Sequence, residues 1–271
     1  MHKEPIEHAL CNEEKIGILL RNRFSVIIPA YNEEKRISRV LDELCNYISI
    51  NHLPWEIIVA VDGDDGTENI VNSYNKKFPF VFSNKASGRS GMGGGIKRGI
   101  LASTGEYLIL MDGDGSSTLQ SIIQSIEPII KYDILNFNRY SQIENKIPLK
   151  RRLASRSFNL MLKVAYGINV SDSQCGYKVM RRAAVMQIIN KLTISNAFFL
   201  SAIFIYAKKY RISVAEVNIH YEHSQGSKFN VLMTSISYIV SIIAFKLRDS
   251  RIYYYTPNTF KELYYRKLKS L

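Results

Sequence analysis

Two carboxylates lie one residue apart at the end of an apolar run in the segment ILMDGDGSST, residues 109–118. Gly113 separates Asp112 from Asp114 and Gly115 follows them, and this flexible backbone lets both side chains turn toward one point. Ligation by oxygen alone selects a hard cation such as Mg²⁺ or Mn²⁺. An ion that completes its shell with substrate phosphates needs only one or two protein carboxylates. Asp before Gly is common in turns. The pair alone is therefore also compatible with a capped surface loop that binds no metal.

In the first half of the chain, short apolar runs alternate with segments that have helical periodicity. The acidic pair follows one of these apolar runs. Strands are expected at residues 23–30, 55–62, 80–84 and 106–112. Helices are expected at residues 33–48, 64–78 and 94–104. This alternation predicts an α/β fold with a Rossmann-like, mostly parallel sheet flanked by helices. In such sheets ligands bind outside the carboxyl ends of the strands, which is where Asp112 and Asp114 fall.

The composition indicates a globular protein with a polyanionic partner. The 271 residues are 46% hydrophobic, enough for one large core or two modest ones. Lysine and arginine exceed aspartate and glutamate by 36 to 24, so nucleic acid, an anionic membrane face or phosphorylated substrates are all candidates. The three cysteines have no metal-ligand spacing, and we interpret them as inert thiols in a reducing compartment.

The two ends of the chain bear on the membrane. The charged N-terminus does not resemble the apolar region of a signal peptide, so export is not expected. The longest apolar stretch, residues 231–245, is shorter than the roughly 20 residues that span a bilayer. It is expected to be either a core-packed helix or a membrane-surface helix. Residues 246–271 mix basic residues with tyrosines, which suits a headgroup layer or a solvated tail.

Six segments occur in the order seen in family 2 inverting glycosyltransferases. They are IPAYNEE, VDGDDGT, GRSGMGGGIKRGILASTGEYLILMDGDGSS, KRRLASRSFNLML, SDSQCGYKVMRR and AEVNIHYEHSQGSK. Between residues 24 and 228 the chain resembles the polyprenyl-phosphate branch of that family, whose members transfer glucose or mannose to dolichyl phosphate. SDSQCGYKVMRR is most like the glucose-transferring members, whereas GMGGGIKRG is closer to the mannose-transferring ones. The resemblance therefore favours glucose and leaves mannose open.

The resemblance implies a GT-A fold with one catalytic domain at residues 23–230. An N-terminal extension, residues 1–22, would precede it. A C-terminal amphipathic helix and a basic tail, residues 231–271, would follow it and attach the protein peripherally to the cytoplasmic face of a membrane.

The resemblance also implies the site residues. Those for the nucleotide-sugar are Pro29, Ala30, Tyr31, Glu33, Asp62, Arg89, Asp112, Gly113, Asp114, Asp172 and Gln174. Those for the acceptor phosphate are Arg139, Arg151, Ser227 and Lys228. Among them the catalytic set is Asp114, Arg139, Arg151 and Lys228, and the metal ligands for Mg²⁺ or Mn²⁺ are Asp112 and Asp114. Without the resemblance, Glu33 would be a helix-start charge, Asp172 an Asx turn and Arg151 part of a solvated face.

The implied reaction is metal-dependent, inverting transfer of a hexose from a nucleoside-diphosphate sugar, such as UDP-glucose or GDP-mannose, to a polyprenyl phosphate. Phe199 and Ser201 stand where the glucose-transferring pattern has two acids. This departure is compatible with a phosphate acceptor, which is already an anion and needs no base. One alternative is a soluble transferase with a hydroxyl acceptor. A remoter alternative is a noncatalytic polyanion-binding module, but no nucleic-acid-binding motif supports nucleic acid as a partner.

Overall fold

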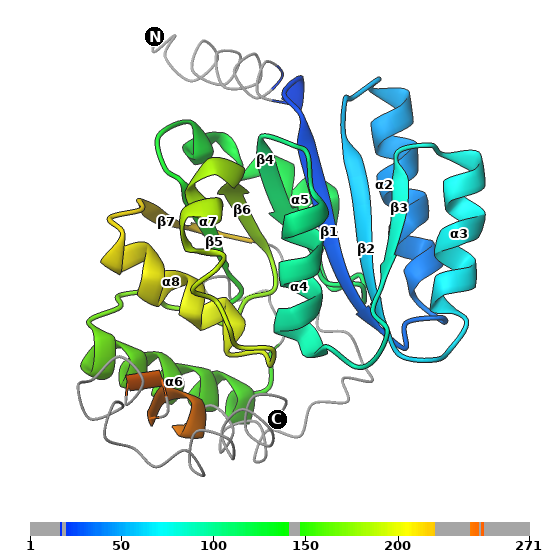
Figure 1. Ribbon diagram of the computed structural model, residues 1–271. Coiled ribbons are helices and arrows are strands. Elements are labelled where there is room, and N and C mark those ends of the chain that lie inside the picture. Colours follow the sequence, from blue (N-terminus) through cyan, green and yellow to red (C-terminus); the bar gives the residue numbers. More distant parts are fainter. Residues whose placement is uncertain (1–16, 18–19, 141–146, 220–238, 244, 247–271) are drawn as a thin grey trace, which may run out of the picture.

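The computed structural model describes residues 17, 20–140, 147–219, 239–243 and 245–246 (Figure 1). Within them, seven strands form one sheet in the order β3-β2-β1-β4-β6-β5-β7. The strands are β1 (Phe24–Tyr31), β2 (Glu56–Asp62), β3 (Val81–Lys85), β4 (Tyr107–Leu110), β5 (Ile134–Asn138), β6 (Lys178–Arg181) and β7 (Val214–Asn218). The predicted mostly parallel sheet is therefore confirmed.

One strand runs against the others, and this reversal shapes the site. β6 is antiparallel to both neighbours, β4 and β5, whereas every other strand pair in the described sheet is parallel. Leu110 at the carboxyl end of β4 pairs with Lys178 at the amino end of β6. The loop that precedes β6 therefore lies at the carboxyl end of β4, beside the acidic pair.

Helices cover both faces of the sheet, as the alternation predicted (Figure 1). On one face, a core forms beneath α2 (Ile37–Ile50), α3 (Thr67–Lys77), α5 (Leu119–Gln124) and the 3₁₀ turn η1 (Glu127–Ile130). On the other face, a second core forms beneath α4 (Gly91–Ala102), α6 (Leu149–Tyr166), α7 (Arg182–Ile188) and α8 (Phe199–Lys209). The period-2 pattern of the strands explains the two cores, since Val26 and Ile28 face the first and Ile27 the second.

The observed helices begin a few residues away from their predicted starts, for local reasons. α2 begins at Ile37 instead of residue 33, because the Glu33 carbonyl accepts the Arg36 and Ile37 amides in a tight turn. α3 begins at Thr67 instead of residue 64, because the Asp65 carboxylate accepts the Thr67 amide 3.1 Å away.

The glycine-rich segment is part of α4 and allows it to pack closely. This helix begins at Gly91, three residues before the predicted start. A methyl group at Gly93 would lie 2.6 Å from Phe199 Cβ and 2.8 Å from the Asn196 carbonyl oxygen. A methyl group at Gly99 would lie 2.4 Å from Ile27 Cγ2. These glycines therefore bring α4 against both the sheet and the start of α8.

The described part of the C-terminal apolar stretch is helical and packs on one side. Phe245 is buried beside the rings of Tyr166, Phe198 and Tyr206, and the Tyr166 hydroxyl donates to the Ile242 carbonyl over 2.9 Å. One side of this part, with Ile242 and Phe245, therefore packs on the core. None of the described helices is both long enough and apolar enough to cross a bilayer. Most of the predicted segments 1–22 and 231–271 lie outside the described residues, so these boundaries stay predictions.

Candidate active site

The acidic pair lies where the carboxyl end of β4 meets the ends of β1 and β6. A methyl group at Gly113 would lie 3.6 Å from Glu33 Cγ and 3.7 Å from the Pro29 carbonyl oxygen. The acidic pair therefore adjoins the end of β1. On the β6 side, a methyl group at Gly176 would lie 2.2 Å from Asp112 Oδ1. The missing side chain of Gly176 thus leaves the space that the Asp112 carboxylate occupies. The Asp114 carboxylate accepts the Ser116 amide over 2.9 Å.

The electrostatics of the pair suit a cation. Burial, together with the Asp114 charge, raises the pKa of Asp112 to about 6. The positive charges of Arg139, Lys178 and Arg151 act in the opposite direction on this pKa. Two adjacent carboxylates with hard oxygen donors fit Mg²⁺ or Mn²⁺, because a divalent ion offsets both burial and mutual repulsion. Within the described residues, no group of three or more His, Cys, Asp or Glu gathers as a metal cluster.

The residues predicted to hold the nucleotide lie at the neighbouring strand ends. Pro29, Ala30 and Tyr31 complete β1, and Tyr31 is 42% exposed. The Arg89 guanidinium lies 4.8 Å from the centre of this ring, so these two predicted residues are brought together. An exposed aromatic face beside a cation is suited to a planar base and a phosphate.

Two predicted acids already have partners within the chain. The Asp62 carboxylate accepts the Ser90 amide over 3.0 Å and pairs with Arg98 over 3.1 Å, which secures the segment before α4. Glu33 forms a two-pronged ion pair with Arg36, with both contacts at 2.6 Å. Glu33 precedes the first turn of α2, so the helix-start alternative does not describe its position.

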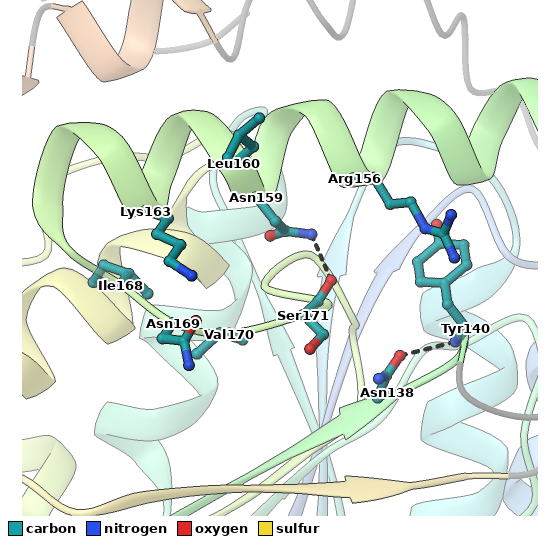
Figure 2. A pocket seen from close by; sticks show the side chains of 10 residues that line it. All are labelled: Asn138, Tyr140, Arg156, Asn159, Leu160, Lys163, Ile168, Asn169, Val170 and Ser171. Atoms are coloured by element: carbon teal, nitrogen blue, oxygen red, sulfur yellow. Dashed lines mark hydrogen bonds between the residues drawn. The ribbon is translucent and has the colours of Figure 1, made fainter.

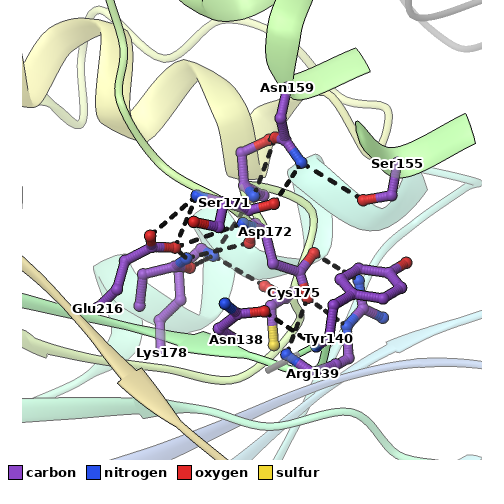
Figure 3. Close-up of polar contacts among 12 residues, drawn as sticks. Asn138, Arg139, Tyr140, Ser155, Asn159, Ser171, Asp172, Cys175, Lys178 and Glu216 are labelled. Atoms are coloured by element: carbon purple, nitrogen blue, oxygen red, sulfur yellow. Dashed lines mark hydrogen bonds and ion pairs between the residues drawn. The ribbon is translucent and has the colours of Figure 1, made fainter. Parts of the chain in front are cut away.

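Arg139 and Asp172 form a buried ion pair (Figure 3). Arg139 Nε and Nη2 donate to the two Asp172 oxygens over 2.8 and 2.9 Å, and the Arg139 amide donates over 3.2 Å. Burial works to lower the pKa of Arg139, but the Asp172 charge outweighs it and holds the pKa well above its ordinary value. Arg139 is expected to contact the acceptor phosphate and Asp172 the nucleotide-sugar. In the structure the two side chains are paired with each other. The pair ties β5 to the loop before β6.

The same loop is held by a buried lysine that sequence reasoning missed (Figure 3). Lys178 is fully buried, and its Nζ donates to Asn136 Oδ1 over 2.6 Å and to the Cys175 carbonyl over 2.8 Å. Burial lowers the pKa of Lys178 to about 8. The only signal for this residue was a lysine inside the apolar run YKVM.

Glu216 on β7 completes this network from the other side. Its carboxylate accepts the Ser171 amide over 2.9 Å and Asn136 Nδ2 over 3.0 Å. Asn136 therefore links Glu216 to Lys178, since its amide donates to the first and its oxygen accepts from the second. Contacts from β5, β6 and β7 thus converge on the loop at residues 171–176.

Gln174 and Ser201 meet in the interior. Gln174 Nε2 donates to the Ser201 hydroxyl, which in turn donates to Ser173 Oγ over 3.0 Å. Ser201 and Phe199, which replace the two acids of the glucose-transferring pattern, are both fully buried. In place of a carboxylate, this position therefore supplies a hydroxyl that secures Gln174.

A pocket of about 420 Å³ lies beside the Arg139–Asp172 pair, under α6 (Figure 2). Its lining is Asn138, Tyr140, Arg156, Asn159, Leu160, Lys163, Ile168, Asn169, Val170 and Ser171. It combines two cations and several amides with aliphatic side chains, so it suits a ligand that is part anion and part hydrocarbon.

Of the remaining predicted site residues, the structure describes Arg151 but not Ser227 or Lys228. Arg151 lies in the first turn of α6, and its charge is close enough to lower the pKa of Asp112. Ser227 and Lys228 lie outside the described residues. The thiols of Cys45 and Cys175 are free and buried, and burial raises the pKa of each to about 12.

Comparison with known proteins identifies relatives along most of the chain. A family model described as Glycosyl transferase family 2 matches residues 25–189. A dolichyl-phosphate beta-glucosyltransferase of Dictyostelium discoideum is 29% identical over 241 residues, covering 83% of this chain and 74% of the relative. Proteins of the same description from Saccharomyces cerevisiae and Homo sapiens are each 26% identical, over 82% and 76% of this chain and 74% and 69% of theirs.

The fold of this chain, GT-A, is also found in solved structures of other proteins. Mannosyl-3-phosphoglycerate synthase from Rubrobacter xylanophilus matches with a TM-score of 0.66 at 16% identity, over 91% of this chain and 82% of its own. Glucosyl-3-phosphoglycerate synthase from Mycobacterium tuberculosis matches with a TM-score of 0.60 at 15% identity, over 86% and 83%. The latter was crystallised with Mn²⁺, UDP-glucose and phosphoglyceric acid.

We expect Mn²⁺ to bind through Asp112 and Asp114. Asp112→Asn and Asp114→Asn should each weaken Mn²⁺ binding in the presence of UDP about tenfold or more, measured by electron paramagnetic resonance. Since a proton competes with the ion at Asp112, wild-type affinity should also fall as the pH drops through about 6. Glu106→Gln, which removes an exposed carboxylate just before the opposite end of β4, is the control. Unchanged binding in both aspartate variants would contradict the metal assignment.

Lys178 should make stability depend on alkaline pH. Its folded pKa of about 8 lies below the unfolded value of 10.5, so between these values the unfolded chain binds more protons. Stability should therefore rise with pH in this window, relative to the variant Lys178→Met. The variant should also lose about 1–3 kcal/mol near neutral pH, because the Asn136 and Cys175 oxygens lose their donor. Urea unfolding across this pH range measures both effects, with the exposed Lys76→Met as control. If the stabilities of wild type and Lys178→Met changed with pH in parallel, the pKa of Lys178 would not be lowered by folding.

Proposed function

The chain belongs to glycosyl transferase family 2, and we propose that it transfers glucose from UDP-glucose to dolichyl phosphate or another polyprenyl phosphate. The relatives that carry the name dolichyl-phosphate beta-glucosyltransferase support the sugar and the acceptor. The glucosyl-3-phosphoglycerate synthase complex supports UDP-glucose, because the same fold holds this donor there. The observation that carries the proposal is the acidic pair at the end of β4 with Arg139, Arg151 and Lys178 close enough to act on it.

The donor would lie across the carboxyl ends of β1, β2 and β4. Tyr31 and Arg89 offer a ring face and a cation to the nucleotide, while Asp62 holds the segment that carries Arg89 through its contacts to Ser90. Asp112 and Asp114 would hold Mg²⁺ or Mn²⁺ at the diphosphate. The ion, when bound, supplies positive charge for the leaving group.

Transfer would be a single displacement. A phosphate oxygen of the acceptor forms a bond to the anomeric carbon, the bond from that carbon to the UDP oxygen breaks, and UDP leaves with the electron pair. Attack from the face opposite the leaving group inverts the anomeric centre. No base is needed because a phosphate monoester is an anion near neutral pH. The buried hydroxyl of Ser201 and the apolar Phe199, in place of two acids, are compatible with this acceptor.

The acceptor phosphate needs positive charge to position it. Arg151 is half-buried and acts on Asp112 through its charge, so it is the described residue that best fits this role. Arg139 would act through Asp172, by fixing the loop that carries Gln174 and Gly176. Ser227 and Lys228 stay proposed acceptor contacts. We also propose that the protein works at the cytoplasmic face of a membrane, with residues 231–271 contributing to attachment.

A panel of UDP- and GDP-hexoses offered with citronellyl phosphate, a short water-soluble polyprenyl phosphate, tests the proposal. UDP-glucose should be the preferred donor by about tenfold or more, as expected where a site recognises polar groups of its substrate. The product should have the mass of a hexosyl lipid phosphate and the β anomer expected from inversion. Preference for GDP-mannose would replace the sugar assignment. Transfer to a saccharide hydroxyl, with none to the lipid phosphate, would favour the soluble alternative.

Arg151→Gln tests the acceptor contact. Loss of one charged contact to a phosphate should slow transfer to citronellyl phosphate by about ten- to a hundredfold. Slow hydrolysis of UDP-glucose by water should change far less, since water has no phosphate to lose. The neighbouring Lys150→Gln is the matched control and should leave both rates near the wild-type values. Equal loss of transfer and hydrolysis in Arg151→Gln would assign the residue to the donor diphosphate.

A further inference from the structure

One face of α6 is apolar and exposed. Leu149, Leu153, Leu160 and Val164 are 69%, 53%, 61% and 79% exposed. Their spacing of four, seven and four residues places them along one side of a helix with 3.6 residues per turn. The buried residues of α6, Phe158, Asn159 and Leu162, lie on the opposite side. We call the four exposed residues the α6 stripe.

Two further exposed apolar side chains lie on a segment that packs against the end of α6. Ile239 and Ile243, 41% and 54% exposed, lie on the short helical segment that contacts the end of α6 through Tyr166 and Ile242. Among the described residues, these two and the stripe make up six of the thirteen exposed large hydrophobic side chains. Such a concentration of exposed apolar side chains on two neighbouring helical segments indicates a contact surface.

The charge around the stripe selects the partner. α6 contains five lysines and arginines and no acidic residue. Lys150, Arg156 and Lys163 are exposed and lie at the edges of the stripe on the helical projection. A central apolar band with basic flanks is the pattern of a helix that lies in the interface of an anionic bilayer.

Other occupants fit this charge less well. A second copy packed about a twofold axis would bring two such basic helices together, and like charges oppose association. The C-terminal residues 246–271 carry seven lysines and arginines against two acids, so they do not complement the helix either. An anionic lipid surface satisfies the apolar stripe and its flanks at once.

We infer that the exposed face of α6 docks the protein on an anionic lipid bilayer. This inference rests on the proposed function, because it explains how the site reaches an acceptor embedded in a membrane. Three exposed residues of α6, Arg156, Leu160 and Lys163, also line the pocket under this helix (Figure 2). A lipid phosphate at the bilayer surface would therefore meet this amphipathic pocket as soon as α6 lies in the headgroup layer.

Flotation of the full-length protein with vesicles tests the surface. Wild type should float with vesicles of phosphatidylcholine and phosphatidylserine, and less so with phosphatidylcholine alone or in about 1 M NaCl. The double variant Leu153→Ser/Val164→Ser should lower binding about tenfold or more, because two apolar side chains leave the interface. Lys150→Gln should lower it about fivefold. The matched control is Ile50→Ser/Leu101→Ser, which removes two side chains of similar exposure, 76% and 49%, from α2 and α4.

An activity measurement separates the surface from the reaction. The stripe variant should turn over citronellyl phosphate in solution at the wild-type rate, and should lose turnover of a long-chain polyprenyl phosphate embedded in vesicles. Thermal unfolding and sedimentation confirm that it remains folded and show its oligomeric state.

Three results would overturn the inference. Flotation of the stripe variant equal to wild type would place membrane binding elsewhere, and a wild type that turns over citronellyl phosphate but never floats would remove the membrane surface while leaving the proposed function intact. A wild-type dimer that the stripe variant dissociates would assign the face to a second copy. Conversely, flotation that depends on the stripe, with no turnover of either acceptor, would support the surface and overturn the proposed function.

Discussion

The site depends on the buried ion pair between Arg139 and Asp172. Neither side chain has appreciable contact with solvent, so each charge is tolerable only because the other is present. Removal of either partner leaves an uncompensated buried charge, which costs about 3–5 kcal/mol. The pair joins the end of β5 to a loop far along the chain. The ion pair therefore fixes the loop that carries Gln174 to the sheet at Asp172.

Lys178, Asn136 and Glu216 extend this constraint from one contact to a whole loop. Lys178 donates hydrogen bonds to backbone carbonyls of the loop, and Glu216 accepts hydrogen bonds from backbone amides of the same loop. The loop is therefore held both through its carbonyls and through its amides. The result matters for the acidic pair, because Gly176 borders the Asp112 carboxylate on this side. A rigid border of this kind keeps the carboxylate in place when the charge at the site changes. The raised pKa of Asp112 is thus a consequence of the packing that positions it.

The side of the site at Tyr31 and Arg89 is built by close packing of α4 against the sheet. The glycines of α4 allow the helix to approach Ile27 and Phe199 closely, and Asp62 anchors the segment before it through Ser90 and Arg98. Arg89 is carried by that segment to the face of Tyr31. The glycine-rich sequence is therefore mostly helical, as predicted for residues 94–104, and the helix begins three residues earlier than predicted. Its small residues serve close contact with the sheet and with α8.

The sequence by itself determined the strands and helices of the first half and the place of Asp112 and Asp114 at a strand end. These features depend on local periodicity and turn chemistry, which a short segment carries within itself. In the second half, β6 has only four residues and begins and ends with a basic residue, so its local signal is weaker. Only the tertiary structure decided that Arg139 meets Asp172, that Lys178 is buried and that Leu149, Leu153 and Leu160 of α6 are exposed. The physical reason is that the reversal of β6 and the packing of α6 bring together groups from distant parts of the chain, and burial, which sets their charges and partners, exists only after that assembly.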